Sequence, residues 1–256
     1  MSTLLAGALG TLVFCAPGYP GAPGDAQPLL DQFASAAVAA SGWPAGSLAA
    51  VYDPTEEGGL AKLKQADAVL AFVPYPFFVE HAAQLHLTPL VQADVADVGP
   101  QQRWTLVAKS GRVTGPASMA GYTLLSVAGY APDFVRHSAL EGWALPPDVK
   151  IEPTGQILSV LRRVAAGEPV AALLDQTQAA ALASLPFAAE IKAVTQSAEL
   201  PVALIAVVDS RVPAARARTL QSALLKMGHG AGADSLGPLR LHGFVPLKLP
   251  SRTMAP

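Results

Sequence analysis

The stretch ADAVLAFVPYPFFVEHA (residues 66–82) decides the predicted fold. Residues 68–73 form an apolar run without the alternation of a half-exposed strand, which indicates a strand buried on both faces, as in parallel sheets. Pro74 closes this run, and a helix is predicted at once over about residues 76–84. A strand that leads directly into a helix is the repeating unit of α/β folds.

The same pattern continues on both sides of this stretch. Apolar runs bounded by Gly, Pro or Asp predict strands at 11–16, 47–52, 104–109, 123–127, 149–152, 170–174, 191–196 and 202–208. Apolar residues at a spacing of three or four predict helices at 27–41, 155–166 and 213–227, with a further helix beginning at Thr55 and shorter ones at 133–140 and 176–185. The alternation of strands with helices predicts an α/β fold.

Composition narrows the class of protein. Of 256 residues, 51% are hydrophobic and only 14% are charged, with a net charge of -2. This balance argues against a disordered chain and against a nucleic-acid-binding protein, which needs a basic face to meet phosphates. The single cysteine, Cys15, excludes an intramolecular disulfide and a multi-cysteine zinc site.

Residues 1–24 carry no charged side chain, and this stretch is the one to examine for a membrane span or a signal peptide. Several Gly and Pro residues interrupt it, and no Lys or Arg precedes its apolar part, so neither feature is visible. The chain therefore fits a cytosolic protein, or an exported protein from which the leader has been removed.

The sequence contains no recognisable catalytic constellation. It has no P-loop and no G-x-S-x-G motif, and its five histidines are scattered. Glu56 and Glu57 follow Thr55 at a predicted helix start, where acidic residues have a structural role. We therefore expect no catalytic residues, no metal site and no cofactor.

Aromatic residues gather instead just beyond predicted strand ends. Tyr19 follows the first strand, Tyr75, Phe77 and Phe78 follow the strand at 68–73, and Tyr130 and Phe134 follow the strand at 123–127. Because ligands of open α/β sheets bind at the carboxyl ends of strands, these turns predict a pocket. Packing of each aromatic ring onto the core is the alternative.

Asp175 also stands at such a position. It ends the apolar strand at 170–174 and precedes Gln176, so either residue could anchor a ligand, while an N-cap of the following helix is the structural alternative for Asp175.

At this point the chain resembles a periplasmic substrate-binding protein of ABC transporters, type II, of the phosphate/phosphonate family. The resemblance rests on a first strand that ends in a Pro-Gly-Tyr turn and on the order and spacing of ADAVLAFVPYPFFVEHA (66–82), WTLVAKSG (104–111), ASMAGYTLLSVAGYAPDFV (117–135), VLRRVAAGEPVAALLDQTQ (160–178), LPVALIAVVDSRVPAARARTLQSALLKM (200–227) and LRLHGFVPL (239–247). The last two long blocks are the most specific.

The resemblance implies two α/β lobes with a hinge and an interlobe cleft. One lobe would comprise residues 1–95 and 203–256 and the other 96–202, with hinges near 90–94 and 197–201. It also implies a periplasmic monomer that binds a small molecule without catalysis and docks on the membrane components of a transporter.

The chain departs from the family where phosphonate binders place hydroxyl groups and backbone N–H groups. That position reads VAGYAPD (residues 127–133): the hydroxyls are absent, Pro132 lacks an N–H, and Asp133 adds negative charge. We therefore expect phosphonate to bind poorly, and an apolar molecule such as a lipid or sterol to bind instead. The predicted ligand-binding residues are Tyr19, Tyr75, Phe77, Phe78, Tyr130, Phe134, Asp175 and Gln176.

Three alternatives remain open. The first is a phosphonate, phosphate or other small polar solute, which the family resemblance favours. The second is an enzyme on the same two-lobed scaffold. The third is a sensory or partner-binding module.

Overall fold

The computed structural model describes residues 10–18, 23–228 and 232–250. These residues divide into two compact units. The first takes 10–16, 23–100, 201–228 and 232–249, and the second takes 17–18, 101–200 and 250. The chain passes between the units after Pro100 and after Leu200, where the short strands β5 (Gln101–Gln102) and β11 (Leu200–Pro201) pair.

The first unit is built on a six-stranded sheet in the order β13-β4-β12-β3-β1-β2. Strand β1 pairs in parallel with both β2 and β3, while β12 runs antiparallel to β3 and β4. The elements of this unit are β1 (Gly10–Cys15), α1 (Pro23–Ser41), β2 (Leu48–Asp53), α2 (Glu56–Leu63), β3 (Ala68–Pro74), α3 (Tyr75–Leu85), β4 (Leu87–Val95), β12 (Ala203–Val208), α7 (Ala214–Met227), the short turns η4 (Ala233–Ser235) and η5 (Gly237–Leu239), and β13 (Leu241–Val245).

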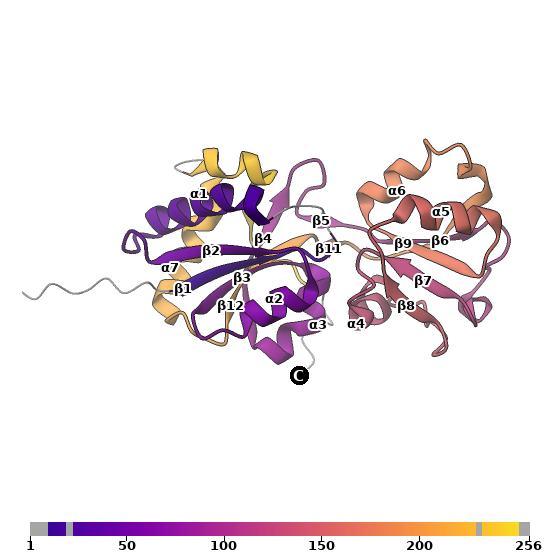
Figure 1. Cartoon of the computed structure of the whole chain (residues 1–256), viewed down its shortest axis with the longest axis horizontal. Coiled ribbons are helices and arrows are strands. Elements are labelled where there is room, and N and C mark those ends of the chain that lie inside the picture. Colours follow the sequence, from indigo (N-terminus) through magenta and orange to yellow (C-terminus); the bar gives the residue numbers. More distant parts are fainter. Residues whose placement is uncertain (1–9, 19–22, 229–231, 251–256) are drawn as a thin grey trace, which may run out of the picture. The chain divides into compact units, whose positions relative to one another are not determined.

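Helices cover both faces of this sheet. Figure 1 shows α1 and α2 on opposite sides of β1, β2 and β3; α7 packs beside α1, and α3 packs on β3 and β4. Burial on two sides explains why β3 reads as an unbroken apolar run. On the α1 side, Phe14, Phe33, Phe72 and Phe244 form an aromatic cluster with ring centroids 5.0 to 6.3 Å apart.

The second unit has a five-stranded sheet in the order β10-β6-β9-β7-β8. Strand β7 pairs in parallel with β8 and β9, and β6 runs antiparallel to β9 and β10. Its elements are β6 (Thr105–Lys109), η1 (Pro116–Met119), β7 (Thr123–Ser126), α4 (Pro132–Phe134), the π-helical turn η2 (Val135–Ala139), β8 (Lys150–Pro153), α5 (Ile157–Ala166), β9 (Val170–Leu174), α6 (Gln176–Leu182), η3 (Ala188–Glu190) and β10 (Ile191–Gln196).

Helix α5 supplies much of the core of this unit. Val160, Leu161 and Val164 pack as one stripe against Val107 and Leu125 of the sheet. This stripe is the apolar face that the sequence predicts for residues 155–166.

The structure refines two expectations about the fold. Residues 90–94, expected to form a hinge, lie inside β4, where β12 and β13 pair on either side. Val91 and Ala93 are fully buried there, so the segment belongs to a sheet interior. The helix expected at 133–140 begins as α4 but continues as the π-helical turn η2. In the part of the chain that the structure describes, no helix is both long and apolar enough to cross a bilayer.

Candidate functional site

The parallel strands of the first unit end at Cys15, Asp53 and Pro74. The Asp53 carboxylate accepts hydrogen bonds from the backbone N–H of Thr55 at 2.9 Å and from its hydroxyl at 2.7 Å, and it pairs with Lys62. Burial alone would raise the pKa of Asp53, but the hydrogen bonds from Lys62 and Thr55 outweigh it and hold the pKa below its usual value. Thr55 is the N-cap of α2, a helix that the sequence predicts to begin at this residue.

Cys15 lies where α2 approaches the end of β1 most closely. Its Sγ is 3.4 Å from the carbonyl oxygen of Thr55, and a Cβ at Gly59 would lie only 2.0 Å from that sulfur. Glycine is therefore required at this point of α2. Burial, with the nearby carboxylates of Asp53 and Glu56, raises the pKa of the Cys15 thiol to about 12, so it is not a nucleophile at neutral pH.

The aromatic residues predicted at the start of α3 are buried. Tyr75 stacks on Phe78 with ring centroids 6.3 Å apart, and Phe77 meets the His81 ring at 4.7 Å. The backbone N–H of Tyr75 donates to the carbonyl of Val202, which fixes the helix start beside β12. These contacts give the three rings a packing role within their own unit.

Sequence reasoning missed the contact between His81 and Glu56. Nε2 of His81 lies 2.9 Å from Oε1 of Glu56 and so joins α3 to α2. Burial lowers the pKa of His81, and the Glu56 carboxylate opposes this in part. The two residues are 25 positions apart, and no local pattern connects them.

In the second unit, parallel strands β7 and β9 end side by side. The buried hydroxyl of Ser126 donates to the carbonyl of Leu173 at 2.8 Å and accepts from the N–H of Ala128 at 3.1 Å. A Cβ at Gly129 would lie 2.1 Å from the carbonyl oxygen of Glu152 in β8. The turn after β7 is thus held against both neighbouring strands.

This turn carries two of the predicted aromatic residues. Tyr130 is half-buried, whereas Phe134 is buried and meets the Trp104 ring edge-to-face, with centroids 5.3 Å apart. Asp133 lies on the exposed side of α4. Sequence reasoning missed Trp104, which it treated only as the start of a strand.

Asp175 has the structural role that the sequence left open. Its carboxylate accepts from the backbone N–H of Gln178 at 2.8 Å, and the Gln178 side chain accepts in turn from the N–H of Asp175, which makes Asp175 the N-cap of α6. Burial raises the pKa of Asp175, and the capping hydrogen bonds oppose this. Gln176 is exposed.

The predicted site residues therefore fall into two groups. The first unit holds Tyr75, Phe77 and Phe78, and the second holds Tyr130, Phe134, Asp175 and Gln176. Tyr19 lies outside the described residues. Their joint role in ligand binding stays a prediction. Among the described residues, no group of three His, Cys, Asp or Glu side chains is placed to hold a metal ion.

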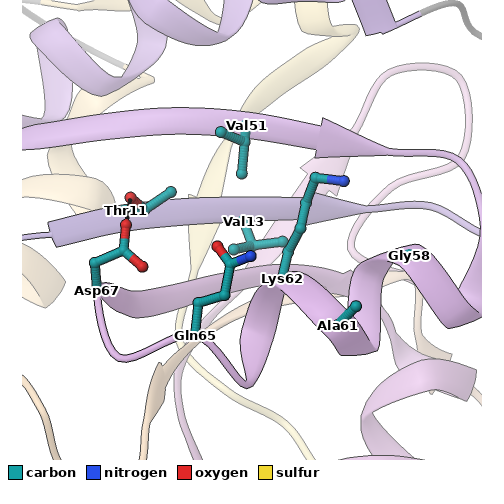
Figure 2. Close-up of a pocket in the computed structure, with 8 residues that line it drawn as sticks. All are labelled: Thr11, Val13, Val51, Gly58, Ala61, Lys62, Gln65 and Asp67. Carbon is teal, nitrogen blue, oxygen red and sulfur yellow. Dashed lines mark hydrogen bonds between the residues drawn. The ribbon is translucent and has the colours of Figure 1, made fainter.

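A small pocket lies beside α2 in the first unit. Its volume is about 260 Å³. Figure 2 shows the residues that line it, which come from α2 and the turn after it and from strands β1 and β2. It is lined by Thr11, Val13, Val51, Gly58, Ala61, Lys62, Gln65 and Asp67. None of the predicted ligand residues takes part, and Lys62 is already paired with Asp53 while Asp67 accepts from the Thr11 hydroxyl at 2.9 Å. This pocket is not the predicted ligand site.

Solved structures share this fold. XAC2383 from Xanthomonas citri, bound to chloride ion, has a TM-score of 0.67 and 15% identity, covering 93% of this chain and 92% of that one. PhnD1 from Prochlorococcus marinus, in complex with methylphosphonate, has a TM-score of 0.55 and 12% identity, covering 94% and 93%. A binding-protein component of an ABC phosphonate transporter from Pseudomonas aeruginosa has a TM-score of 0.54 and 14% identity, covering 92% and 80%.

Sequence comparison gives the family. Curated proteins yield no match. The profile of the family described as "ABC transporter, phosphonate, periplasmic substrate-binding protein" matches residues 90–251, which is more than half of the chain. Membership implies a periplasmic location, a small-molecule ligand and the membrane components of a transporter. The chain belongs to the phosphonate-type periplasmic substrate-binding proteins of ABC transporters.

Proposed function

We propose that this family member captures a small, uncharged and mainly apolar solute for its transporter, and that phosphonate is a poor ligand. The observation that carries the proposal is the composition of the turn after β7. Val127, Ala128 and Ala131 are apolar and buried, and Asp133 lies where a phosphonate binder would offer hydroxyl groups.

Charge at this end of the second unit supports the proposal. The segments that follow β7, β9 and β10 carry the carboxylates of Asp133, Asp175 and Glu199. The segment before β6 adds one cation, Arg103, which is engaged with Glu199 at 3.6 Å and with the carbonyl of Ser197 at 3.1 Å. A phosphonate dianion placed here would meet more like charge than opposite charge, which costs several kcal/mol.

The two predicted aromatic residues of the second unit differ in exposure. Phe134 is buried against Trp104, and Tyr130 is the half-buried ring of the predicted set in the second unit. We therefore propose that Tyr130 contacts the solute directly, while Phe134 supports the apolar surface beneath it. A lipid or sterol-like molecule is one member of this ligand class.

Phosphonate itself is the second candidate. It is favoured by the family profile and by the fold shared with PhnD1, a protein solved with methylphosphonate. Calorimetric titration separates the candidates: methylphosphonate and inorganic phosphate are compared with a panel of uncharged lipids and sterols. We expect an uncharged member of the panel to give a heat of binding and, in a parallel titration, a change in intrinsic fluorescence. Micromolar methylphosphonate should give neither signal.

A variant without the Asp133 carboxylate tests whether its charge disfavours phosphonate. Asp133→Asn should improve the weak binding of methylphosphonate, because it removes a carboxylate from the turn after β7. Asp234→Asn makes the same change of net charge at an exposed position of the first unit and serves as the control. Micromolar methylphosphonate binding by the unaltered chain contradicts the proposal.

We further propose that the chain is a monomer. Light scattering measures the molar mass in solution and tests this.

A further inference from the structure

The indole of Trp104 is a buried donor for which the described residues supply no acceptor. Only 1% of Trp104 is exposed, and within the described part of the chain no acceptor lies within hydrogen-bond distance of its Nε1. Leaving a buried N–H unpaired destabilises a folded protein, and native structures contain few such groups. The donor therefore calls for a partner that the described residues do not supply.

Strand pairing places this donor at the carboxyl end of the sheet in the second unit. Thr105 of β6 pairs with Leu174 of the antiparallel strand β9. Trp104, which precedes Thr105, therefore lies beside Asp175, the N-cap of α6. The backbone N–H of Trp104 donates to the Ser197 hydroxyl at 2.8 Å. The backbone that carries the indole is thus held between the start of β6 and the end of β10. This is the edge of the sheet where α/β proteins bind ligands.

The surroundings of the indole are aromatic and irregular. Its ring meets Phe134 edge-to-face at an interplanar angle of 71°. Phe134 ends α4, and the chain continues as the π-helical turn η2. Such turns occur often at functional sites. Two apolar rings with a single N–H donor suit a ligand that is apolar except for one orienting group.

We infer that Nε1–H of Trp104 is the hydrogen-bond donor that orients the solute, and that the solute carries an uncharged oxygen acceptor, such as a carbonyl or hydroxyl, on an apolar body. The inference rests on the proposed function. An acceptor would satisfy the unpaired donor, and the carboxylates of Asp133, Asp175 and Glu199 disfavour an anionic oxygen. Because Nε1 is covered, neighbouring side chains must shift when the oxygen arrives.

The test uses three probes with one common ring: cyclohexanone, cyclohexylamine and cyclohexylphosphonate. Indole N–H signals of ¹⁵N-labelled protein are assigned with Trp43→Phe, Trp104→Phe and Trp143→Phe. Cyclohexanone should move the Trp104 signal. Trp104→Phe keeps a ring and removes the donor, so it should weaken cyclohexanone binding by about three- to tenfold, the effect of one neutral hydrogen bond.

Trp143→Phe is the matched control. Nε1 of the partly buried Trp143 is also covered and without an acceptor among the described residues, but this indole lies on the segment that leads from η2 to the start of β8. Its removal should leave cyclohexanone affinity unchanged. Circular dichroism and thermal midpoints establish that both variants are folded; if Trp104→Phe is not, the indole signal of the unaltered protein decides alone.

The outcomes separate this inference from the proposed function. An unmoved Trp104 signal during cyclohexanone binding, together with unchanged affinity in folded Trp104→Phe, overturns the role of Trp104 and leaves the apolar ligand class standing. Tighter binding of cyclohexylphosphonate than of cyclohexanone overturns both. So does a failure of cyclohexanone to bind at all.

Discussion

Gly129→Ala should distort the turn after β7, on which the proposed ligand class depends. The added Cβ would lie 2.1 Å from the carbonyl oxygen of Glu152 and 2.6 Å from the nitrogen of Pro153. Both atoms belong to the backbone of β8, so no side chain can rotate away to make room. Either the turn or the strand must shift.

Overpacking of this kind costs about 1 to 3 kcal/mol. In a chain of this size, each kcal/mol lowers the thermal midpoint by about 2 to 4 °C, so Gly129→Ala should lower it by at least about 2 °C. Scanning calorimetry measures the midpoint. Binding of an uncharged solute should weaken in parallel, because the turn carries Tyr130.

Gly155→Ala is the control for this prediction. Gly155 belongs to the same unit, and a Cβ there would meet no atom within 4 Å. Its thermal midpoint should stay within about 1 °C of the unaltered protein, since substitutions at open surface positions change stability little. Equal midpoints for Gly129→Ala and Gly155→Ala would refute the close contact between the turn and β8.

Three further predictions concern the polar groups at the strand ends. With a pKa of about 12, Cys15 should resist alkylation at neutral pH in the folded protein and react fully in urea; rapid labelling of folded protein would contradict its burial. The pKa of Asp53 is lowered on folding, so its contribution to stability is present above about pH 4 and is lost as the pH falls toward the lowered pKa. Asp53→Asn should therefore lower the urea midpoint more at neutral pH than in acid, with the difference from the unaltered protein shrinking as the pH falls below about 4; an equal loss at every pH would contradict this. Asp175→Ala should cost about 0.5 to 2 kcal/mol through the lost N-cap, and Asp175→Asn much less; similar urea unfolding of both variants would count against the capping role.

Local pattern predicted the parallel core well. The unbroken apolar run at 68–73 becomes β3, and the run at 170–174 coincides with β9, because strands covered on both faces exclude polar residues wherever they lie. The start of α2 at Thr55 was also predicted, since it depends only on neighbouring residues.

Longer-range features were not visible. Residues 87–95 contain Thr88, Pro89, Gln92 and Asp94, which broke the apolar pattern, yet pairing with β12 and β13 holds them in β4. The pairing of His81 with Glu56 and the unpaired Trp104 indole likewise depend on elements brought together by the fold. The ligand-binding role of the aromatic residues after the strands stays a prediction, and pattern alone could not distinguish a buried ring, such as Phe77, from a half-buried one, such as Tyr130.

Mass spectrometry of the small molecules that co-purify with the chain tests the central claim most directly. Protein is purified without denaturation, extracted with organic solvent, and compared with a sample unfolded and dialysed before extraction. The account predicts a stoichiometric, phosphorus-free molecule that is mainly apolar and carries an uncharged oxygen. A stoichiometric phosphonate or phosphate ester would contradict it.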